Sequence, residues 1–118
     1  MTGVQTCALP ISIALIEDDL PVIVVMPSPK SAPILHAKLL SNIREIQTRG
    51  AITIVIAEEG DEGVVPFADV VIRVPVTPPL LAPLVTTVPL QVFACELATA
   101  KGLDVDQPRN LAKSVTVE

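Results

Sequence analysis

A chain of 118 residues with 50% hydrophobic residues has the length and composition of one folded domain, which excludes a disordered segment. Its formal net charge of −5 excludes the basic stripe that phosphate backbones require, so we expect no nucleic acid partner. The only aromatic residues are Phe67 and Phe93, so the core must be aliphatic and offers no stacking platform for bases.

The two cysteines and the apolar runs indicate the cellular compartment and whether the chain crosses a membrane. Cys7 and Cys95 have neither the spacing of a metal site nor that of a redox motif, so we expect the reducing cytoplasm and no metal. The longest apolar runs, such as Pro21–Pro27 and Ala51–Ala57, are too short to span a bilayer, and we expect no membrane partner. Such runs suit strands that are buried on both faces.

The N-terminal segment differs in character from the rest of the chain. Met1–Ile11, MTGVQTCALPI, has neither a helical hydrophobic period nor the basic start of a signal peptide. The string resembles the in-frame translation of a common short-read sequencing adapter, with Ser12 at the junction. We therefore interpret residues 1–12 as adapter-derived rather than as a short native arm, and we expect the native protein to extend upstream of Ile13.

From Ile13 onward the chain alternates between short strands and helices. Runs of β-branched residues predict strands over Val22–Met26, Ile52–Ala57 and Val70–Val74, with one helix between the first two and another after the third. This order is typical of an α/β sheet with parallel strands. Three short strands make only part of such a sheet, so we predict a half-domain over Ile13–Gly102 that exposes a sheet edge and apolar faces.

The first predicted helix has signals at both ends. Ser31 can cap it, Pro33 suits its first turn, and Gly50 suits the position after its end. Its apolar stripe consists of Leu35, Leu39, Ile43 and Ile46. We predict that His36, on the same helix, faces solvent.

The second predicted helix begins near Leu80 and contains a proline. Pro89 should end or kink it, because proline removes a backbone hydrogen bond and clashes with the preceding turn. Leu90–Lys101 is apolar almost all round, so we expect a buried helix that Gly102 stops. The tail, Leu103–Glu118, is polar and is expected to be irregular.

The end of the chain carries a family resemblance. Residues Asp104–Glu118 read DVDQPRNLAKSVTVE, which strongly resembles the C-terminus of glucosamine-6-phosphate synthases, also called glutamine–fructose-6-phosphate aminotransferases. Upstream, Ile13–Glu17 (IALIE), Leu20–Val25 (LPVIVV) and Thr87–Gln91 (TVPLQ) also fit this family. The resemblance therefore covers the chain from residue 13 to its end.

The resemblance implies a fold and an activity. The family's C-terminal half is an isomerase of two sugar-isomerase (SIS) subdomains, each a flavodoxin-like three-layer α/β sandwich. Residues 13–102 would then be a partial second SIS subdomain, and residues 103–118 its catalytic tail. The family's enzyme is a homodimer that needs no cofactor. It takes ammonia from glutamine in an N-terminal glutaminase domain, passes it to fructose 6-phosphate and forms glucosamine 6-phosphate.

The resemblance also implies site residues in the tail. Lys113 matches the family's tail lysine, which forms a Schiff base with the C2 carbonyl of the open-chain sugar. An amine must be neutral to attack, and Arg109, four residues earlier, would lower the pKa of Lys113 if this stretch is helical. Ala112, beside Lys113, is expected to line the sugar site through its backbone.

The family's other catalytic parts fall outside this sequence. Its phosphate-binding loop belongs to the first SIS subdomain, and its acid–base glutamate and ring-opening histidine lie upstream of the segment that Ile13 begins. Because catalytic groups act as a unit, we predict that the isolated chain is inactive.

Three other interpretations fit the sequence less well. A non-catalytic SIS-type module that binds a sugar phosphate for sensing would have no use for the lysine-bearing tail, and a DNA-binding helix-turn-helix upstream would identify it. Glu17–Asp19 resembles the acidic pocket of a receiver domain, but a receiver also needs a phospho-acceptor Asp and a Lys at later strand ends. The later predicted strands are followed instead by Glu58 and Pro75. The acidic turn Glu58–Glu62 lacks the alternating ligands of a calcium loop, and we interpret it as solvated.

Overall fold

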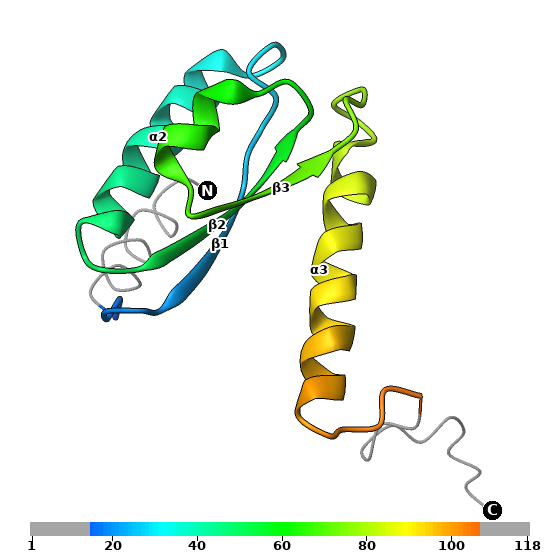
Figure 1. Ribbon diagram of the computed structural model, residues 1–118. Coiled ribbons are helices and arrows are strands. Elements are labelled where there is room, and N and C mark those ends of the chain that lie inside the picture. The colour runs from blue at the N-terminus through cyan, green and yellow to red at the C-terminus, as the bar shows by residue number, and fades with distance from the viewer. Residues whose placement is uncertain (1–14, 107–118) are drawn as a thin grey trace, which may run out of the picture. The chain divides into compact units, whose positions relative to one another are not determined.

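The computed structural model describes residues 15–106 (Figure 1). The chain divides into two compact units, Met1–Thr86 and Thr87–Glu118. The first unit contains a parallel sheet and the helix that covers it, and the second contains most of one long helix.

Three strands, β1 (Pro21–Val25), β2 (Ile52–Glu58) and β3 (Val70–Val74), form the sheet of the first unit. β2 lies in the centre, and both of its neighbours run parallel to it. The helix α2 (Pro33–Gln47) connects β1 to β2, and the 3₁₀ helix η1 (Glu62–Phe67) connects β2 to β3. The predicted α/β fold with parallel strands is therefore confirmed.

The core of this unit lies between α2, η1 and one face of the sheet. Ile43 of α2, Val55 of β2 and Val64 of η1 are fully buried, and they pack together with Met26 and Ala57. Ile43 belongs to the apolar stripe that the sequence predicts for this helix, so the stripe is confirmed at its centre. Short aliphatic side chains fill the core, as the scarcity of aromatic residues requires.

The opposite face of the sheet is apolar but incompletely covered. Alternation along paired strands places Val25, Ile52, Ile56 and Val70 on this face. Ile56 is fully buried, whereas Val25, Ile52 and Val70 are 41%, 39% and 48% exposed. The predicted exposure of apolar surface is confirmed for this unit.

The start of α2 differs from the prediction. Pro33 is the first helical residue, as expected, but Ala32 is the N-cap residue and no side chain caps the helix. The cap predicted for Ser31 is therefore wrong. A backbone turn precedes the helix instead, because the Ala32 N–H donates to the Ser28 carbonyl oxygen at 3.0 Å.

Gly50 allows two loop segments to approach each other closely. It has φ 83°, a backbone conformation that favours glycine, and a Cβ at this position would lie 1.9 Å from Asp18 Oδ1. The neighbouring Asp19 N–H donates to the Gly50 carbonyl oxygen at 2.8 Å. This contact ties the segment before β1 to the segment before β2.

The helix α3 (Ala82–Ala100) departs most from the sequence prediction. It continues through Pro89, since proline removes one hydrogen bond while the remaining turns keep theirs. None of its residues is buried, so the prediction of a buried helix over Leu90–Lys101 is wrong for the described chain. The continuous helix has 19 residues, and among the described helices it is the one that is long and apolar enough to cross a membrane. Core helices of soluble proteins have the same length and composition.

Candidate functional site

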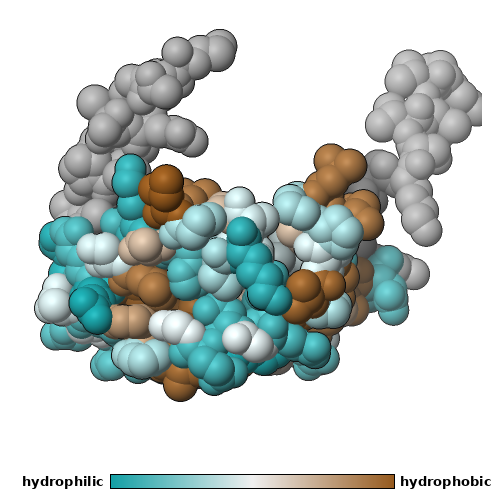
Figure 2. Space-filling view, turned by 90° about the horizontal axis from the view of Figure 1, so that it is seen from above, coloured by the Kyte–Doolittle hydropathy of each residue, from teal (hydrophilic) through white to brown (hydrophobic). Residues whose placement is uncertain are grey.

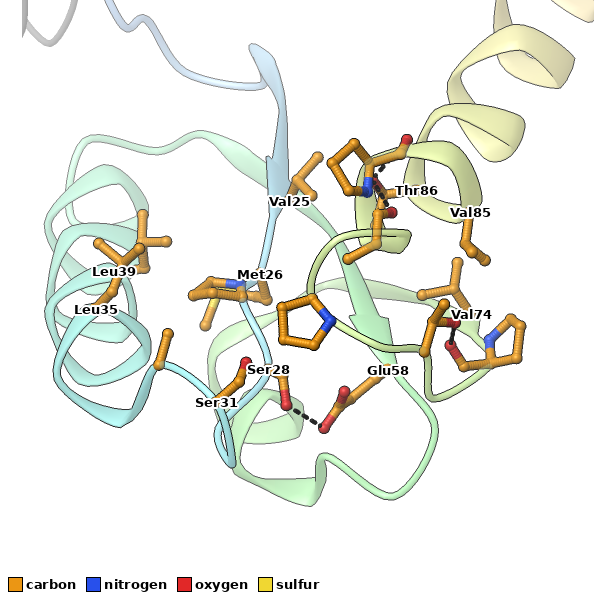
Figure 3. Close-up of a pocket in the computed structure, with 17 residues that line it drawn as sticks. Val25, Met26, Ser28, Ser31, Leu35, Leu39, Glu58, Val74, Val85 and Thr86 are labelled. Carbon is orange, nitrogen blue, oxygen red and sulfur yellow. Dashed lines mark hydrogen bonds between the residues drawn. The ribbon is translucent and has the colours of Figure 1, made fainter.

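A pocket of about 360 Å³ opens at the carboxyl edge of the sheet (Figure 3). Val25, Glu58 and Val74, the last residues of β1, β2 and β3, all line it. Ligands of open α/β sheets bind outside the carboxyl ends of the strands. The pocket is therefore the candidate binding site of the described residues.

The walls of the pocket are mainly aliphatic. Figure 3 shows Leu35 and Leu39 of α2 facing Met26, which follows β1. Prolines after β1 and β3 complete much of the lining. Apolar side chains also reach the outer surface of this unit, among them Ile34 and Leu80, and Figure 2 shows such hydrophobic areas between hydrophilic ones.

One carboxylate gives the pocket its polarity. Glu58 is the only charged side chain in the lining formed by the described residues. Ser28, in the turn after β1, donates its hydroxyl to Glu58 Oε1 at 2.9 Å (Figure 3). The hydroxyls of Thr77 and Thr86 donate to backbone carbonyls of Pro75 and Ala82, so their protons are already used.

An arginine holds the backbone that carries Glu58. Arg73 of β3 donates from Nη1 to the carbonyl oxygens of Asp61, at 2.8 Å, and of Glu58, at 3.3 Å. Its Nη2 lies 3.4 Å from Glu62 Oε1, a pair with an exposed carboxylate. Arg73 thus fixes the turn after β2 through two carbonyls.

A buried His–Asp pair fixes the same turn from the other side. His36 Nε2 lies 2.7 Å from Asp61 Oδ2, and both side chains are buried. The prediction that His36 faces solvent is wrong, and so is the interpretation of Asp61 as part of a solvated turn. His36 lies three and seven residues before Leu39 and Ile43, so helical spacing places it on the inward stripe, where Asp61 satisfies its polar atom.

A second carboxylate has a structural role at the other end of the strands. Asp69 Oδ2 accepts hydrogen bonds from the Thr53 backbone N–H, at 2.7 Å, and from its hydroxyl, at 2.8 Å. These two donors, the backbone one foremost, lower the pKa of Asp69 below the ordinary value of 3.8. The pair links the start of β2 to the start of β3.

The structure does not describe the residues that the sequence predicts for catalysis. Lys113, Ala112 and Arg109 fall outside the described residues. Within residues 15–106, no cluster of three His, Cys, Asp or Glu side chains could hold a metal ion. Ser28 and Glu58 are not among the residues that the sequence predicts for the site, although a polar residue at the end of a buried strand is a detectable signal.

Comparisons with known proteins identify the relatives of this chain. The model of the SIS domain family matches residues 8–101. Glutamine–fructose-6-phosphate aminotransferase (isomerizing) of Streptomyces coelicolor is 74% identical over 106 residues, which cover 90% of this chain and 17% of that protein. The protein of the same name from Mycobacterium tuberculosis strain H37Rv is 74% identical over 106 residues, with the same coverage. The chain thus spans 17% of the length of these curated relatives.

A solved structure has the same fold. The C-terminal domain of glucosamine-fructose-6-phosphate aminotransferase from Francisella tularensis superposes with a TM-score of 0.68 and 32% sequence identity. The match covers 82% of this chain and 27% of that one. The parallel sheet with its helices therefore matches part of a known SIS-type structure.

Proposed function

This chain belongs to the SIS domain family, and we propose that it acts as the C-terminal part of the isomerase region of a glutamine–fructose-6-phosphate aminotransferase. The observation that carries the proposal is the 74% identity to such enzymes over 106 of the 118 residues. The reaction of the whole enzyme would use L-glutamine and fructose 6-phosphate, and would yield glucosamine 6-phosphate and L-glutamate. The tail sequence DVDQPRNLAKSVTVE supports the same assignment.

The chemical step assigned to this chain belongs to Lys113. Its neutral amine would attack the C2 carbonyl of open-chain fructose 6-phosphate, and loss of water would leave a Schiff base between Nζ and C2. Arg109 would favour the neutral amine electrostatically, and the Ala112 backbone would line the sugar. The site would need neither metal nor cofactor.

The chain alone is expected to be inactive. It spans 17% of its relatives' length, and the pocket of the described residues contains no cationic side chain for a sugar phosphate. The phosphate site would come from the first SIS subdomain of the parent, and the remaining acid–base groups from residues upstream of the segment that Ile13 begins. A cytoplasmic homodimer is the form expected of that parent.

We also propose that residues 1–12 derive from a sequencing adapter. A non-native segment of this length is compatible with the alignment of the relatives over 106 of the 118 residues, whereas the family model begins its match at residue 8, inside the segment. Genomic sequence across Ser12 tests the assignment, and an unbroken native reading frame through Met1–Ser12 would overturn it.

A lysine substitution in the full-length parent tests the function. Lys113→Arg keeps the charge but removes a nucleophile able to form the imine. We expect loss of sugar isomerisation, by at least a factor of about 10³, with glutaminase activity retained. Lys101→Arg, before the tail, is the matched control and should retain both activities. Isomerisation by the Lys113→Arg enzyme would disprove the Schiff-base role.

A further inference from the structure

We propose that the pocket at the carboxyl edge of the sheet binds a small organic ammonium ion through the Glu58 carboxylate. The proposal does not depend on the sugar-phosphate chemistry assigned to Lys113. Three properties of the described residues carry the inference: the charge of the lining, the orientation of the carboxylate and the shape of the walls.

The charge of the lining selects a cation. Glu58 is its only charged side chain, and no Lys, Arg or His of the described chain lines the pocket. A phosphate or carboxylate would therefore meet one negative charge and no counter-charge. In a partly buried site this repulsion is stronger than in water, so the lining formed by the described residues disfavours anions and favours cations.

The carboxylate of Glu58 is oriented and still able to bind. Ser28 donates to Oε1, which fixes the side chain and leaves most of the lone pairs of the two oxygens for a ligand. Arg73 contacts the Glu58 backbone carbonyl rather than its side chain, and its ion pair is with Glu62. Among residues 15–106, no salt bridge neutralises the Glu58 carboxylate.

The turn that carries Glu58 is held in place before any ligand arrives. Arg73 binds two of its carbonyls, and the His36–Asp61 pair ties it to α2. Because these contacts are internal, a ligand would lose little free energy in ordering the site.

The volume and the aliphatic lining of the pocket favour an ammonium ion with a small apolar substituent. A volume of about 360 Å³ lies at the small end of ligand pockets. Leu35, Leu39, Val74 and Val85 offer aliphatic contact, with no aromatic ring for stacking. A six-membered aliphatic ring with one ammonium group matches both the size and the polarity of the pocket.

Three ligands of equal shape and different charge test this inference. Ligand-observed NMR on the 118-residue chain at low salt would compare cyclohexylammonium, cyclohexanol and cyclohexanecarboxylate. We expect cyclohexylammonium to bind about tenfold more tightly than cyclohexanol, and cyclohexanecarboxylate to bind most weakly. Equal affinities, or a preference for the carboxylate, would overturn the proposal.

Two variants and a control locate the site. Glu58→Gln should lower cyclohexylammonium affinity to that of cyclohexanol and leave cyclohexanol binding unchanged. Glu59→Gln removes the neighbouring charge, which is exposed and outside the lining, and should change nothing. Leu35→Trp, at a 53% exposed lining position, should block all three ligands by filling the pocket. The assignment would be refuted if Glu58→Gln still preferred the ammonium ligand, or if Leu35→Trp still bound the ligands. If Glu58→Gln does not fold, Leu35→Trp tests the site.

Discussion

His36 Nε2 and Asp61 Oδ2 lie 2.7 Å apart inside the first unit, where they join α2 to the turn after β2. Removing one partner would leave the other buried without a hydrogen bond. Asp61→Ala should therefore lower the free energy of unfolding by about 1–3 kcal/mol, measured by urea titration.

An exposed pair at the C-terminal end of α2, between Glu45 of the helix and Arg49 just beyond it, provides the control for this prediction. Glu45 and Arg49 lie 2.9 Å apart, with side chains 52% and 40% exposed. Because solvent screens such pairs, Glu45→Ala should cost no more than about 0.5 kcal/mol. Equal losses for Asp61→Ala and Glu45→Ala would mean that the buried pair contributes nothing beyond a surface contact.

Asp69 makes the stability of the sheet dependent on pH. Its pKa in the folded chain is below the ordinary value of 3.8, because the Thr53 backbone N–H and hydroxyl stabilise the ionised form. The stabilisation is thus present above about pH 4 and is lost as the pH falls through the lowered pKa. Asp69→Asn should be less stable than the original chain at pH 7, and the difference should shrink in acid.

An NMR titration of the carboxyl groups tests this assignment directly. Thr53→Val removes the hydroxyl donor but keeps the backbone donor, so the pKa of Asp69 should move part of the way back to 3.8. A titration of Asp69 at or above 3.8 in the original chain would contradict the hydrogen-bonding account.

Gly50 and Gly60 separate steric clash from backbone strain. Both have positive φ, but a Cβ at Gly50 would meet Asp18, whereas a Cβ at Gly60 would meet no atom within 4 Å. Gly60→Ala should cost about 1–2 kcal/mol from the left-handed backbone alone. Gly50→Ala should cost more, and adding Asp18→Ala should recover the excess. Thermal unfolding of the original chain and these three variants checks this, and equal costs for the two glycines would exclude the clash.

The exposed apolar surface predicts self-association of the 118-residue chain. Leu84 and Val88 of α3 are 68% and 54% exposed. Replacing both with Glu should shift the chain toward monomer in sedimentation velocity, because charged side chains oppose apolar contact. The control is Lys38→Glu on α2, which changes the net charge by the same amount and should leave the association state unchanged. A monomeric original chain would show that the exposed surface does not drive association.

The order of the elements was predictable because it depends on local composition. Runs of β-branched residues mark β2 and β3, and Pro33 marks the start of α2, whatever their partners. The predicted and observed strands agree to within one residue at each end.

The sequence predictions were wrong where contacts between distant parts of the chain determine whether a residue is buried or where a site forms. His36 is buried because Asp61, 25 residues away, satisfies it, and no local pattern encodes that pairing. Pro89 predicts a break in the second helix, but α3 continues through it because the hydrogen bonds of the other turns remain. The pocket brings together the ends of three strands, so Ser28 and Glu58 become neighbours only after the sheet has formed.

The strands lie in the sheet in the order in which they occur in the chain. The connection from β2 to β3 contains a six-residue 3₁₀ helix, whereas that from β1 to β2 contains a helix of 15 residues. Closing the shorter loop loses less chain entropy, so during folding the β2–β3 pair is expected to form before β1 joins it. Pulse-labelled hydrogen exchange should then show that the amides of β3 become protected earlier than those of β1. During synthesis from the N-terminus, β1 and α2 would emerge first and would remain unpaired until β2 and β3 have been made.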